Sequence, residues 1–213
     1  LRQETEFRPK PLFEICGKPI LWHIMKVYAH YGFNQFVLCL GYRGNLIKEY
    51  FLNYEPMNND FTICLGSGGR VTFNGAHREQ NFSVTLVDTG QEALTGSRIC
   101  RVKKYVGDDD FMVTYGDGVA DVNIAALARF HRDHGRVATV AAYRPISRFG
   151  ILDADTSGKV IGFTEKPCLE GLISIGFFVF TPQIFDYLDD SGDCALEREP
   201  LESLAREGQL MAY

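Results

Sequence analysis

The chain has 213 residues, of which 46% are hydrophobic, enough for one sizeable globular domain with a real core. Its formal net charge is −5, from 22 basic and 27 acidic residues. Because no basic stripe offsets this charge, we do not expect nucleic acid as a partner. No apolar run approaches the length of a membrane span, so we expect no membrane association.

The cysteines are scattered, without a Cys-x-x-Cys pair or a histidine at metal-ligand spacing. Several lie inside apolar runs, where cysteine behaves as a small buried hydrophobic residue. We therefore expect reduced thiols and a cytoplasmic location. The positions are Cys16, Cys39, Cys64, Cys100, Cys168 and Cys194.

The first part of the chain predicts helices that alternate with strands. Lys10 stands between two prolines, which hold its segment extended and display the lysine on a stiff loop. A single lysine is nevertheless more often just a solvated charge. Hydrophobic spacing then predicts, in order, a helix over 19–28, a buried strand over 36–40 and a helix over 45–54.

The stretch from 55 to 82 differs from its surroundings, because it is rich in Asn and Gly and has short strand-like pieces at 61–65 and 71–74. We expect a hairpin or flap that leaves the main sheet, with a role as a flap, a subunit contact or both. Residues 83–88 then return to a strand.

Thr95 and Gly96 precede a predicted helix, with Arg98 at its head. A helix start of this kind offers backbone N–H groups to an anion or a base edge, and arginine suits phosphate or ribose oxygens. The alternative is a surface arginine that follows a capping threonine.

The central stretch, 111–121, is an apolar run that ends in Gly-Asp-Gly. A continuous apolar run predicts a strand buried on both faces, as in a parallel sheet. Gly116 and Gly118 permit a sharp turn and a close ligand, which leaves Asp117 at the carboxyl end of the strand. A carboxylate there is placed to hold a divalent cation against phosphate oxygens, although it could equally cap the turn.

The last third predicts a helix over 123–134 closed by Gly135, strands over 137–143, 148–153, 160–164 and 172–180, and helices over 181–188 and 197–207. Glu165 and Lys166 end one strand, where they could grip a sugar hydroxyl and a phosphate or form a surface ion pair of little energy. Gly176 marks a point where a ligand or another backbone comes close.

These elements predict a single α/β domain over 1–213, with a mostly parallel, Rossmann-like sheet flanked by helices and a small β excursion. No Gly-x-Gly-x-x-Gly follows a strand, which disfavours a dinucleotide-dependent dehydrogenase. The residues alone indicate a phosphate-binding protein, with or without a metal.

The sequences of several motifs resemble those of the sugar-1-phosphate nucleotidylyltransferases, in the same order and over essentially the whole chain. The runs at 41–44 and 115–121 resemble the cytidylyl branch of that family. The shared motifs are Arg-Pro-Lys-Pro-Leu (8–12), Gly-Lys-Pro-Ile-Leu-Trp-His-Ile-Met (17–25), Leu-Val-Asp-Thr-Gly (86–90), Thr-Gly-Ser-Arg (95–98), Thr-Tyr-Gly-Asp-Gly-Val-Ala-Asp (114–121) and Phe-Thr-Glu-Lys-Pro (163–167).

The resemblance implies a nucleotidyltransferase fold and Mg²⁺-assisted transfer of a cytidylyl group from CTP to glucose 1-phosphate, giving CDP-glucose and pyrophosphate. A sugar-phosphate oxygen attacks the α-phosphorus in line, which asks for positioning and charge neutralisation rather than a protein nucleophile. It also implies a homo-oligomer.

The same resemblance assigns roles to individual positions. Lys10 corresponds to a lysine that contacts phosphate near the reacting centre, Asp117 to a Mg²⁺ ligand and Gly116 to a residue beside the nucleotide sugar. The remaining positions line the substrates: Thr95, Gly96 and Arg98 at the base and ribose, Glu165 and Lys166 at the sugar phosphate, and Tyr115, Phe149 and Gly176 in the pocket wall.

The resemblance further implies a strand and a glycine-rich loop ending in Gly-Thr-Arg before Leu1, and a second metal-binding aspartate after Tyr213. We therefore expect either a longer chain that carries these parts or a non-catalytic relative with the same fold. The alternatives are a transferase for another nucleotide or sugar, since Ile175 stands where the family tends to have glycine, and a glycosyltransferase with an Asp-held metal.

Overall fold

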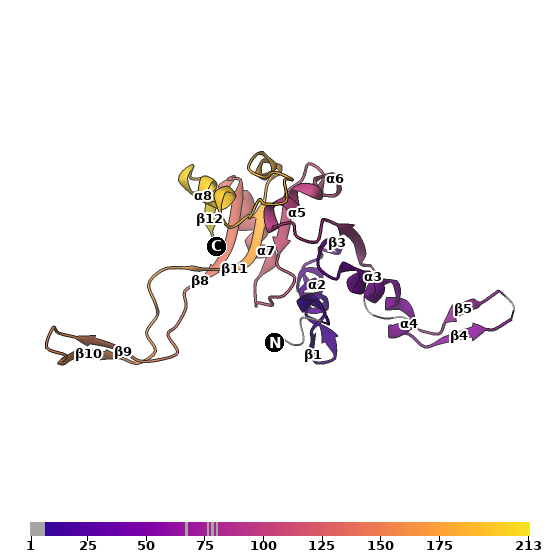
Figure 1. Cartoon of the computed structure of the whole chain (residues 1–213), viewed down its shortest axis with the longest axis horizontal. Coiled ribbons are helices and arrows are strands. Elements are labelled where there is room, and N and C mark those ends of the chain that lie inside the picture. Colours follow the sequence, from indigo (N-terminus) through magenta and orange to yellow (C-terminus); the bar gives the residue numbers. More distant parts are fainter. Residues whose placement is uncertain (1–6, 67, 76, 78, 80) are drawn as a thin grey trace.

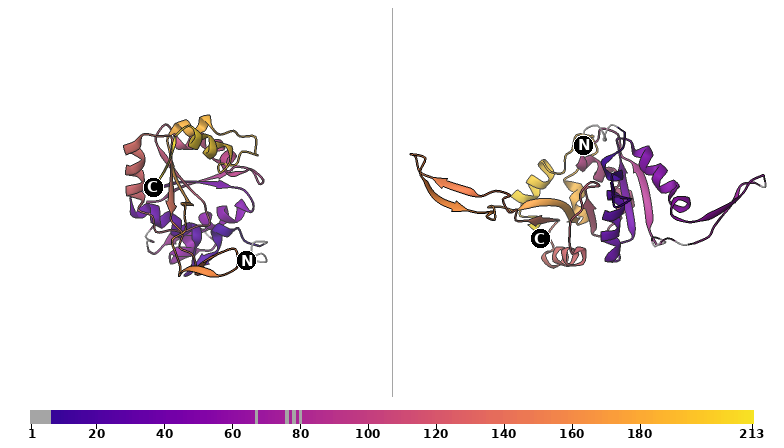
Figure 2. Two further views of the ribbon diagram at one scale, coloured as in Figure 1. Left: turned by 90° about the vertical axis from the view of Figure 1, so that its left-hand side faces the viewer. Right: turned by 90° about the horizontal axis from the view of Figure 1, so that it is seen from below.

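The computed structural model describes residues 7–66, 68–75, 77, 79 and 81–213. A central body of sheets and helices carries two β-hairpins that project in opposite directions (Figures 1 and 2). One projection, the β4–β5 arm, pairs β4 (Phe61–Cys64) with β5 (Arg70–Phe73). The other, the β9–β10 arm, spans residues 144–172 and pairs β9 (Ile151–Ala154) with β10 (Val160–Thr164).

The β4–β5 arm lies within the stretch 55–82, for which we predict a hairpin or flap. Positions 1–6, 67, 76, 78 and 80 lie outside the described residues. The prediction that the segment around Lys10 is extended is wrong, because Lys10–Leu12 form a 3-10 turn with Pro11 within it.

In the described part of the chain, the body contains two larger sheets besides the short pair of β1 (Glu14–Ile15) and β2 (Lys18–Pro19). The first pairs β3 (Gln35–Leu40) with β6 (Ser83–Asp88) in parallel. The second has the order β12-β8-β11-β7. Its strands are β7 (Phe111–Thr114), β8 (Ala138–Tyr143), β11 (Ile173–Phe180) and β12 (Leu210–Ala212).

The α/β class is confirmed, with a mixed second sheet. β12 runs parallel to β8, as predicted for such a fold, but β11 runs antiparallel to both β7 and β8. The reason lies in the connection from β8 to β11. It goes out and back through the β9–β10 arm, whereas parallel neighbours need a crossover, usually a helix.

Helices cover the sheets, and most of them lie where hydrophobic spacing predicts. Asn123 caps the clearest example, α7, by accepting a hydrogen bond from the Ala126 N–H at 2.9 Å, and Gly135 ends it in the left-handed region. The helices are α2 (Ile20–His30), α3 (Gly44–Leu52), α4 (Tyr54–Asn58), α5 (Thr95–Arg101), α6 (Lys103–Val106), α7 (Ile124–His134) and α8 (Glu199–Arg206).

Short elements complete the chain: the 3-10 turns η1 (Lys10–Leu12) and η2 (Pro182–Asp186), and the strand pair β1 (Glu14–Ile15) and β2 (Lys18–Pro19). The helix predicted over 181–188 is thus a 3-10 turn. The last helix begins two residues later than predicted, because Pro200 occupies its first turn and fixes its start.

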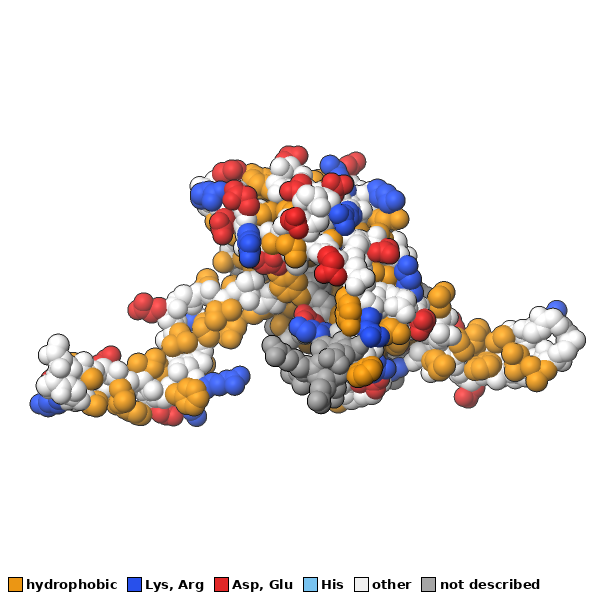
Figure 3. Space-filling model, viewed as in Figure 1, with side chains coloured by type: hydrophobic (Ala, Val, Ile, Leu, Met, Phe, Trp, Pro, Cys, Tyr) orange, Lys and Arg blue, Asp and Glu red, His pale blue; other side chains and the backbone are white. Residues whose placement is uncertain are grey.

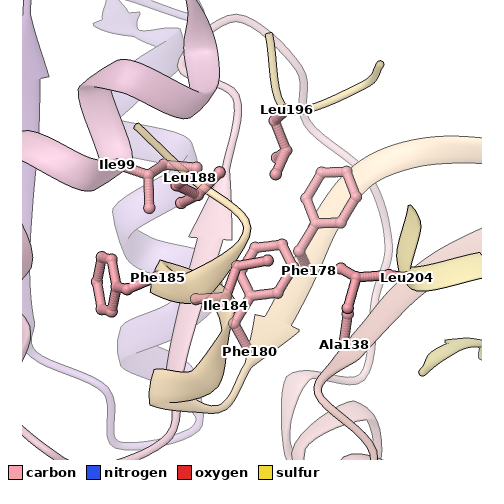
Figure 4. Close-up of a cluster of buried hydrophobic side chains, with 9 residues drawn as sticks. All are labelled: Ile99, Ala138, Phe178, Phe180, Ile184, Phe185, Leu188, Leu196 and Leu204. Carbon is pink, nitrogen blue, oxygen red and sulfur yellow. The ribbon is translucent and has the colours of Figure 1, made fainter. Parts of the chain in front are cut away.

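The core lies on both faces of β11, whose successive side chains alternate between the faces. Phe177 packs with Tyr28 and Leu127 on one face. Phe178 and Phe180 stack on the other, within the cluster shown in Figure 4. That cluster consists of Ile99, Ala138, Phe178, Phe180, Ile184, Phe185, Leu188, Leu196 and Leu204.

The arms, in contrast, have no core of their own. Every residue of β4, β5 and β9 is exposed, and hydrophobic side chains run along both arms in the space-filling view (Figure 3). An isolated two-stranded hairpin is marginally stable at best in water. None of the helices in the described ranges is long and apolar enough to cross a membrane.

Candidate active site

Lys10 and Asp117, which are 107 positions apart, meet at the end of strand β7. The Lys10 Nζ lies 3.4 Å from the Asp117 Oδ2, with 62% and 42% of the respective side chains exposed. An exposed pair at this separation contributes about 0–1 kcal/mol to stability. It brings a cation and an anion together on an open surface without binding them tightly to each other.

Glycine at position 116 makes this meeting possible. A Cβ atom on Gly116 would lie 3.1 Å from the Pro11 Cγ, so the η1 turn rests directly on the backbone of the turn after β7. The neighbouring Leu12 is 5% exposed and packs among Leu21 and Met25, which fixes η1 to the body. Two local devices, a proline-bounded turn and a glycine, thus place Lys10 beside Asp117.

Tyr115, one residue before this turn, is held from two sides. Its N–H donates to the Gly176 carbonyl at 3.3 Å, and its ring lies edge-on to Phe178 at 6.0 Å between centroids. Gly176 has φ +76°, and a Cβ there would lie 2.4 Å from the Tyr115 Cδ2. The close approach predicted at Gly176 is therefore made by the tyrosine ring.

Glu197 is a residue that sequence reasoning missed. The Tyr115 hydroxyl donates to the Glu197 Oε1, and the Thr95 hydroxyl donates to its Oε2 at 2.7 Å. Burial and this carboxylate raise the pKa of the Tyr115 phenol, so the phenol remains a donor. No local signal marks Glu197, because an exposed glutamate in the turn before a helix is ordinary and its partners are far away in the sequence.

The segment before α8 packs against the N-terminus of α5. The Ser97 N–H donates to the Cys194 carbonyl at 3.1 Å, and a Cβ on Gly96 would lie 2.6 Å from the Cys194 Sγ. In the turn where an anion or a base edge is predicted to bind, the Ser97 N–H is therefore already paired. Thr95 uses its hydroxyl on Glu197 instead.

Arg98 lies within α5 rather than at its head, and its side chain reaches the ends of β3 and β6. The guanidinium donates to the Thr89 Oγ1 at 2.9 Å and to the Gln91 carbonyl at 3.1 Å. It also lies against Gly41, where a Cβ would be 2.3 Å from the Nη2. A side chain at position 41 would therefore require the guanidinium to move.

The structure places Glu165 and Lys166 on the β9–β10 arm, away from the other predicted residues (Figure 1). Glu165 lies against Gly150, where a Cβ would be 3.0 Å from the Oε2, and Lys166 has φ +46°. Phe149, on the same arm, is 77% exposed. No hydrogen bond or ion pair among the described residues joins either charged residue to Lys10 or Asp117.

The described residues hold no group of three or more His, Cys, Asp or Glu side chains that could bind a metal ion. Asp117 offers one exposed carboxylate, whose Oδ2 is shared with Lys10. This donor set does not fit a cation held by protein atoms alone. It does fit Mg²⁺, which commonly keeps several waters and is bound by one or two carboxylates together with substrate phosphates.

Comparisons with known proteins bear on this site. The nucleotidyl transferase family matches residues 1–209. A probable glucose-1-phosphate cytidylyltransferase of Bacillus subtilis is 45% identical over 213 residues, which cover 100% of this chain and 82% of the relative. Glucose-1-phosphate cytidylyltransferase of Salmonella typhi is 46% identical over 215 residues, with the same coverage of 100% and 82%.

Among solved structures, HddC from Yersinia pseudotuberculosis superposes with a TM-score of 0.67 at 21% identity, over 97% of this chain and 80% of that one. This likeness confirms the fold alone. The sequence matches show the family as well as the fold: the chain belongs to the nucleotidyl transferase family. The glycosyltransferase alternative is therefore wrong.

Proposed function

We propose that this member of the nucleotidyl transferase family transfers a cytidylyl group from CTP to glucose 1-phosphate, giving CDP-glucose and pyrophosphate. The observation that carries the proposal is the meeting of Lys10 and Asp117, 3.4 Å apart at the end of β7. The two cytidylyltransferases that are 45% and 46% identical to the whole chain support this choice of substrates.

The reaction forms a bond between a phosphate oxygen of glucose 1-phosphate and the α-phosphorus of CTP. The bond from that phosphorus to the pyrophosphate oxygen breaks, and the pyrophosphate leaves with its electron pair. Such a transfer depends mainly on alignment and on neutralisation of phosphate charge. The Lys10 ammonium would neutralise this charge. Its weak, exposed pairing with Asp117 lets it change partner when a phosphate arrives.

Asp117 would hold Mg²⁺ through its carboxylate. When bound, the cation would shield the phosphate oxygens and orient them. Asp117 would also keep the Lys10 ammonium near the reacting centre while the site is without substrate.

The other predicted contacts are part of the proposal. Gly116 would lie beside the nucleotide sugar, and Arg98 would serve the base and ribose side together with the turn at Thr95 and Gly96. Glu165 and Lys166 would hold the sugar phosphate, with Gly176 in the pocket wall. This last role requires the β9–β10 arm to reach an active site, either of its own chain or of a second copy.

We also propose a homo-oligomer that works in the cytoplasm. The exposed apolar side chains on both projecting hairpins suit contacts between copies, and six free cysteines suit a reducing compartment. Light scattering of the purified protein would give the molar mass. A mass equal to one chain would contradict the assembly.

The test is pyrophosphate release by the protein expressed from its complete coding region, with Mg²⁺, glucose 1-phosphate and each of CTP, UTP, dTTP and ATP in turn. Release with CTP alone is expected. Release with another nucleotide would overturn the base assignment but keep the mechanism. No release with any of the four would favour a different sugar or a non-catalytic relative.

Exchange of Asp117 for asparagine tests the metal role. Asp117→Asn should lower the rate and raise the Mg²⁺ concentration needed for half-maximal rate, because the amide loses the negative charge that holds the cation. An unchanged Mg²⁺ titration would contradict this role.

A further inference from the structure

We infer that Glu197, acting through Tyr115, positions the turn that carries Asp117 and ties it to helix α5. The inference rests on the proposed function, in which Asp117 serves the reaction. Neither Glu197 nor Tyr115 is given contact with a reacting atom, so both are positioning residues.

Tyr115 is half-buried and is held at its backbone, its ring and its hydroxyl. Its backbone N–H is held by the Gly176 carbonyl and its ring lies between Gly176 and Phe178. Its hydroxyl, at the far end of the ring, donates to the Glu197 carboxylate. Because Gly116 and Asp117 follow directly, a shift of the tyrosine backbone would move the turn that presents Asp117 to Lys10.

Glu197 is also firmly placed, although its side chain is exposed. The preceding Leu196 is 0% exposed and lies in the core cluster of Figure 4. The Leu196 N–H donates to the Thr95 Oγ1 at 2.9 Å, and the Thr95 hydroxyl in turn donates to the Glu197 Oε2 at 2.7 Å. The carboxylate is therefore held at both of its oxygens.

These contacts join two parts of the proposed site that are distant in the sequence. The Oε1 of Glu197 accepts a hydrogen bond from Tyr115, the residue before the turn with Asp117. The Oε2 accepts one from Thr95, the first residue of α5, which is the helix that carries Arg98. The donors in both contacts are hydroxyl groups. Hydrogen bonds from hydroxyl donors to a charged carboxylate are about twice as strong as those between neutral groups.

The test uses Tyr115→Phe, Glu197→Ala and Glu197→Gln, with Tyr187→Phe as the matched control. The Tyr187 hydroxyl donates to the Glu207 Oε2 at 2.5 Å, so the control removes the same kind of bond elsewhere. Pyrophosphate release is measured against CTP and against Mg²⁺. Tyr115→Phe and Glu197→Ala should lower kcat about tenfold, which is about 1.4 kcal/mol of activation free energy. The KM for CTP should stay within about twofold.

Glu197→Gln should recover most of the rate. Its carboxamide oxygen still accepts from the Tyr115 hydroxyl, and its N–H group can donate to the Thr95 Oγ1. The double variant Tyr115→Phe with Glu197→Ala should lose no more than either single variant, because both remove one shared contact. Additive losses, a parent-like Glu197→Ala, or an equal loss in Tyr187→Phe would overturn the inference.

A second readout separates failure of the inference from failure of the proposed function. Hydrogen–deuterium exchange of peptides that cover 115–121 needs no substrate. Exchange there should become faster in Glu197→Ala and in Tyr115→Phe, and should stay at the parent level in Tyr187→Phe. If the parent makes no CDP-glucose but exchange becomes faster in Glu197→Ala and Tyr115→Phe, the proposed function fails while the positioning role of Glu197 is supported. Unchanged exchange in these two variants overturns the positioning role of Glu197, whatever the parent's activity.

Discussion

The body and the β9–β10 arm each hold part of the predicted site, but the part in the body is packed and the part on the arm is exposed. In the body, Lys10 and Asp117 are brought to 3.4 Å of each other by packed elements: η1 resting on Gly116, and Tyr115 enclosed by its neighbours. On the arm, Glu165 and Lys166 follow an exposed strand with no core beneath it. The packing of the body therefore fixes Lys10 beside Asp117, whereas the proposed sugar-phosphate contacts of Glu165 and Lys166 depend on the position of the β9–β10 arm.

The largest effect should come from the packed half. Lys10→Ala removes the charge that neutralises the phosphate and should lower kcat by about 10²-fold, or about 2.7 kcal/mol. Lys104→Ala is the control, because Lys104 is an exposed lysine whose ammonium lies over the Tyr105 ring. Steady-state kinetics with CTP and glucose 1-phosphate measure both variants. A Lys10→Ala enzyme with parent-like turnover would place the chemistry elsewhere and remove the contrast with the arm.

Local chemistry accounts for the parts that could be predicted from the sequence. Period and capping residues located α7 to within a residue, and an apolar run followed by Gly-Asp-Gly located β7 and the turn with Asp117. The hairpin in 55–82 followed from its Asn- and Gly-rich composition. Each of these features is decided by residues close together in the chain.

What could not be predicted is decided by distant partners. The antiparallel direction of β11 depends on the path of the β9–β10 arm. The pairing of the Ser97 N–H in α5 depends on Cys194, and the hydrogen bond of the Tyr115 hydroxyl depends on Glu197. Residues from 82 to 102 positions apart have no shared local signal, so only the folded structure reveals these contacts.

Gly176→Ala should sharpen the claim that the site in the body is held by close packing. The new methyl group would meet the Tyr115 ring at 2.4 Å and would adopt φ +76°. We expect a loss of about 2 kcal/mol in the free energy of unfolding, from strain and displaced packing. Gly208→Ala, at φ +67° with nothing within 4 Å, is the control and should lose only the backbone part, about 1 kcal/mol. Urea unfolding measures both, and equal losses would show that the ring contact is unimportant.

Lys166→Ala tests the arm half directly. If the arm reaches an active site, loss of the Lys166 ammonium should raise the KM for glucose 1-phosphate about tenfold, which is about 1.4 kcal/mol. The change in the KM for CTP should be smaller. Lys159→Ala, in the turn between β9 and β10, is the control on the same arm. Equal KM values in parent and Lys166→Ala enzymes would restrict the site to the body.

The smallest expected effect is on the pH dependence of stability, and it should again divide the body from the arms. In the body, the Arg136 N–H donates to the His134 Nδ1 at 2.9 Å, so the neutral His134 carries its proton on Nε2. That Nε2 lies 2.7 Å from the Thr139 Oγ1, which is also 2.7 Å from the His131 Nδ1. Burial lowers the pKa of both histidines, so the fold holds them neutral.

Because both folded pKa values lie below the unfolded value of about 6.5, the unfolded chain binds more protons in that window. The stability they contribute is therefore present above pH 6.5 and is lost as the pH falls toward the folded pKa values. Urea midpoints should decrease between pH 7.5 and 5.5 in the parent and decrease less in His134→Gln. His30→Gln, which replaces an exposed histidine, should keep the parent's pH dependence. Since the two arms contribute no buried histidine pair, the protection of peptides from 151–164, which is their exchange rate relative to the intrinsic rate at each pH, should not change over this range. A pH response there and none in the body would reverse the contrast between the two regions.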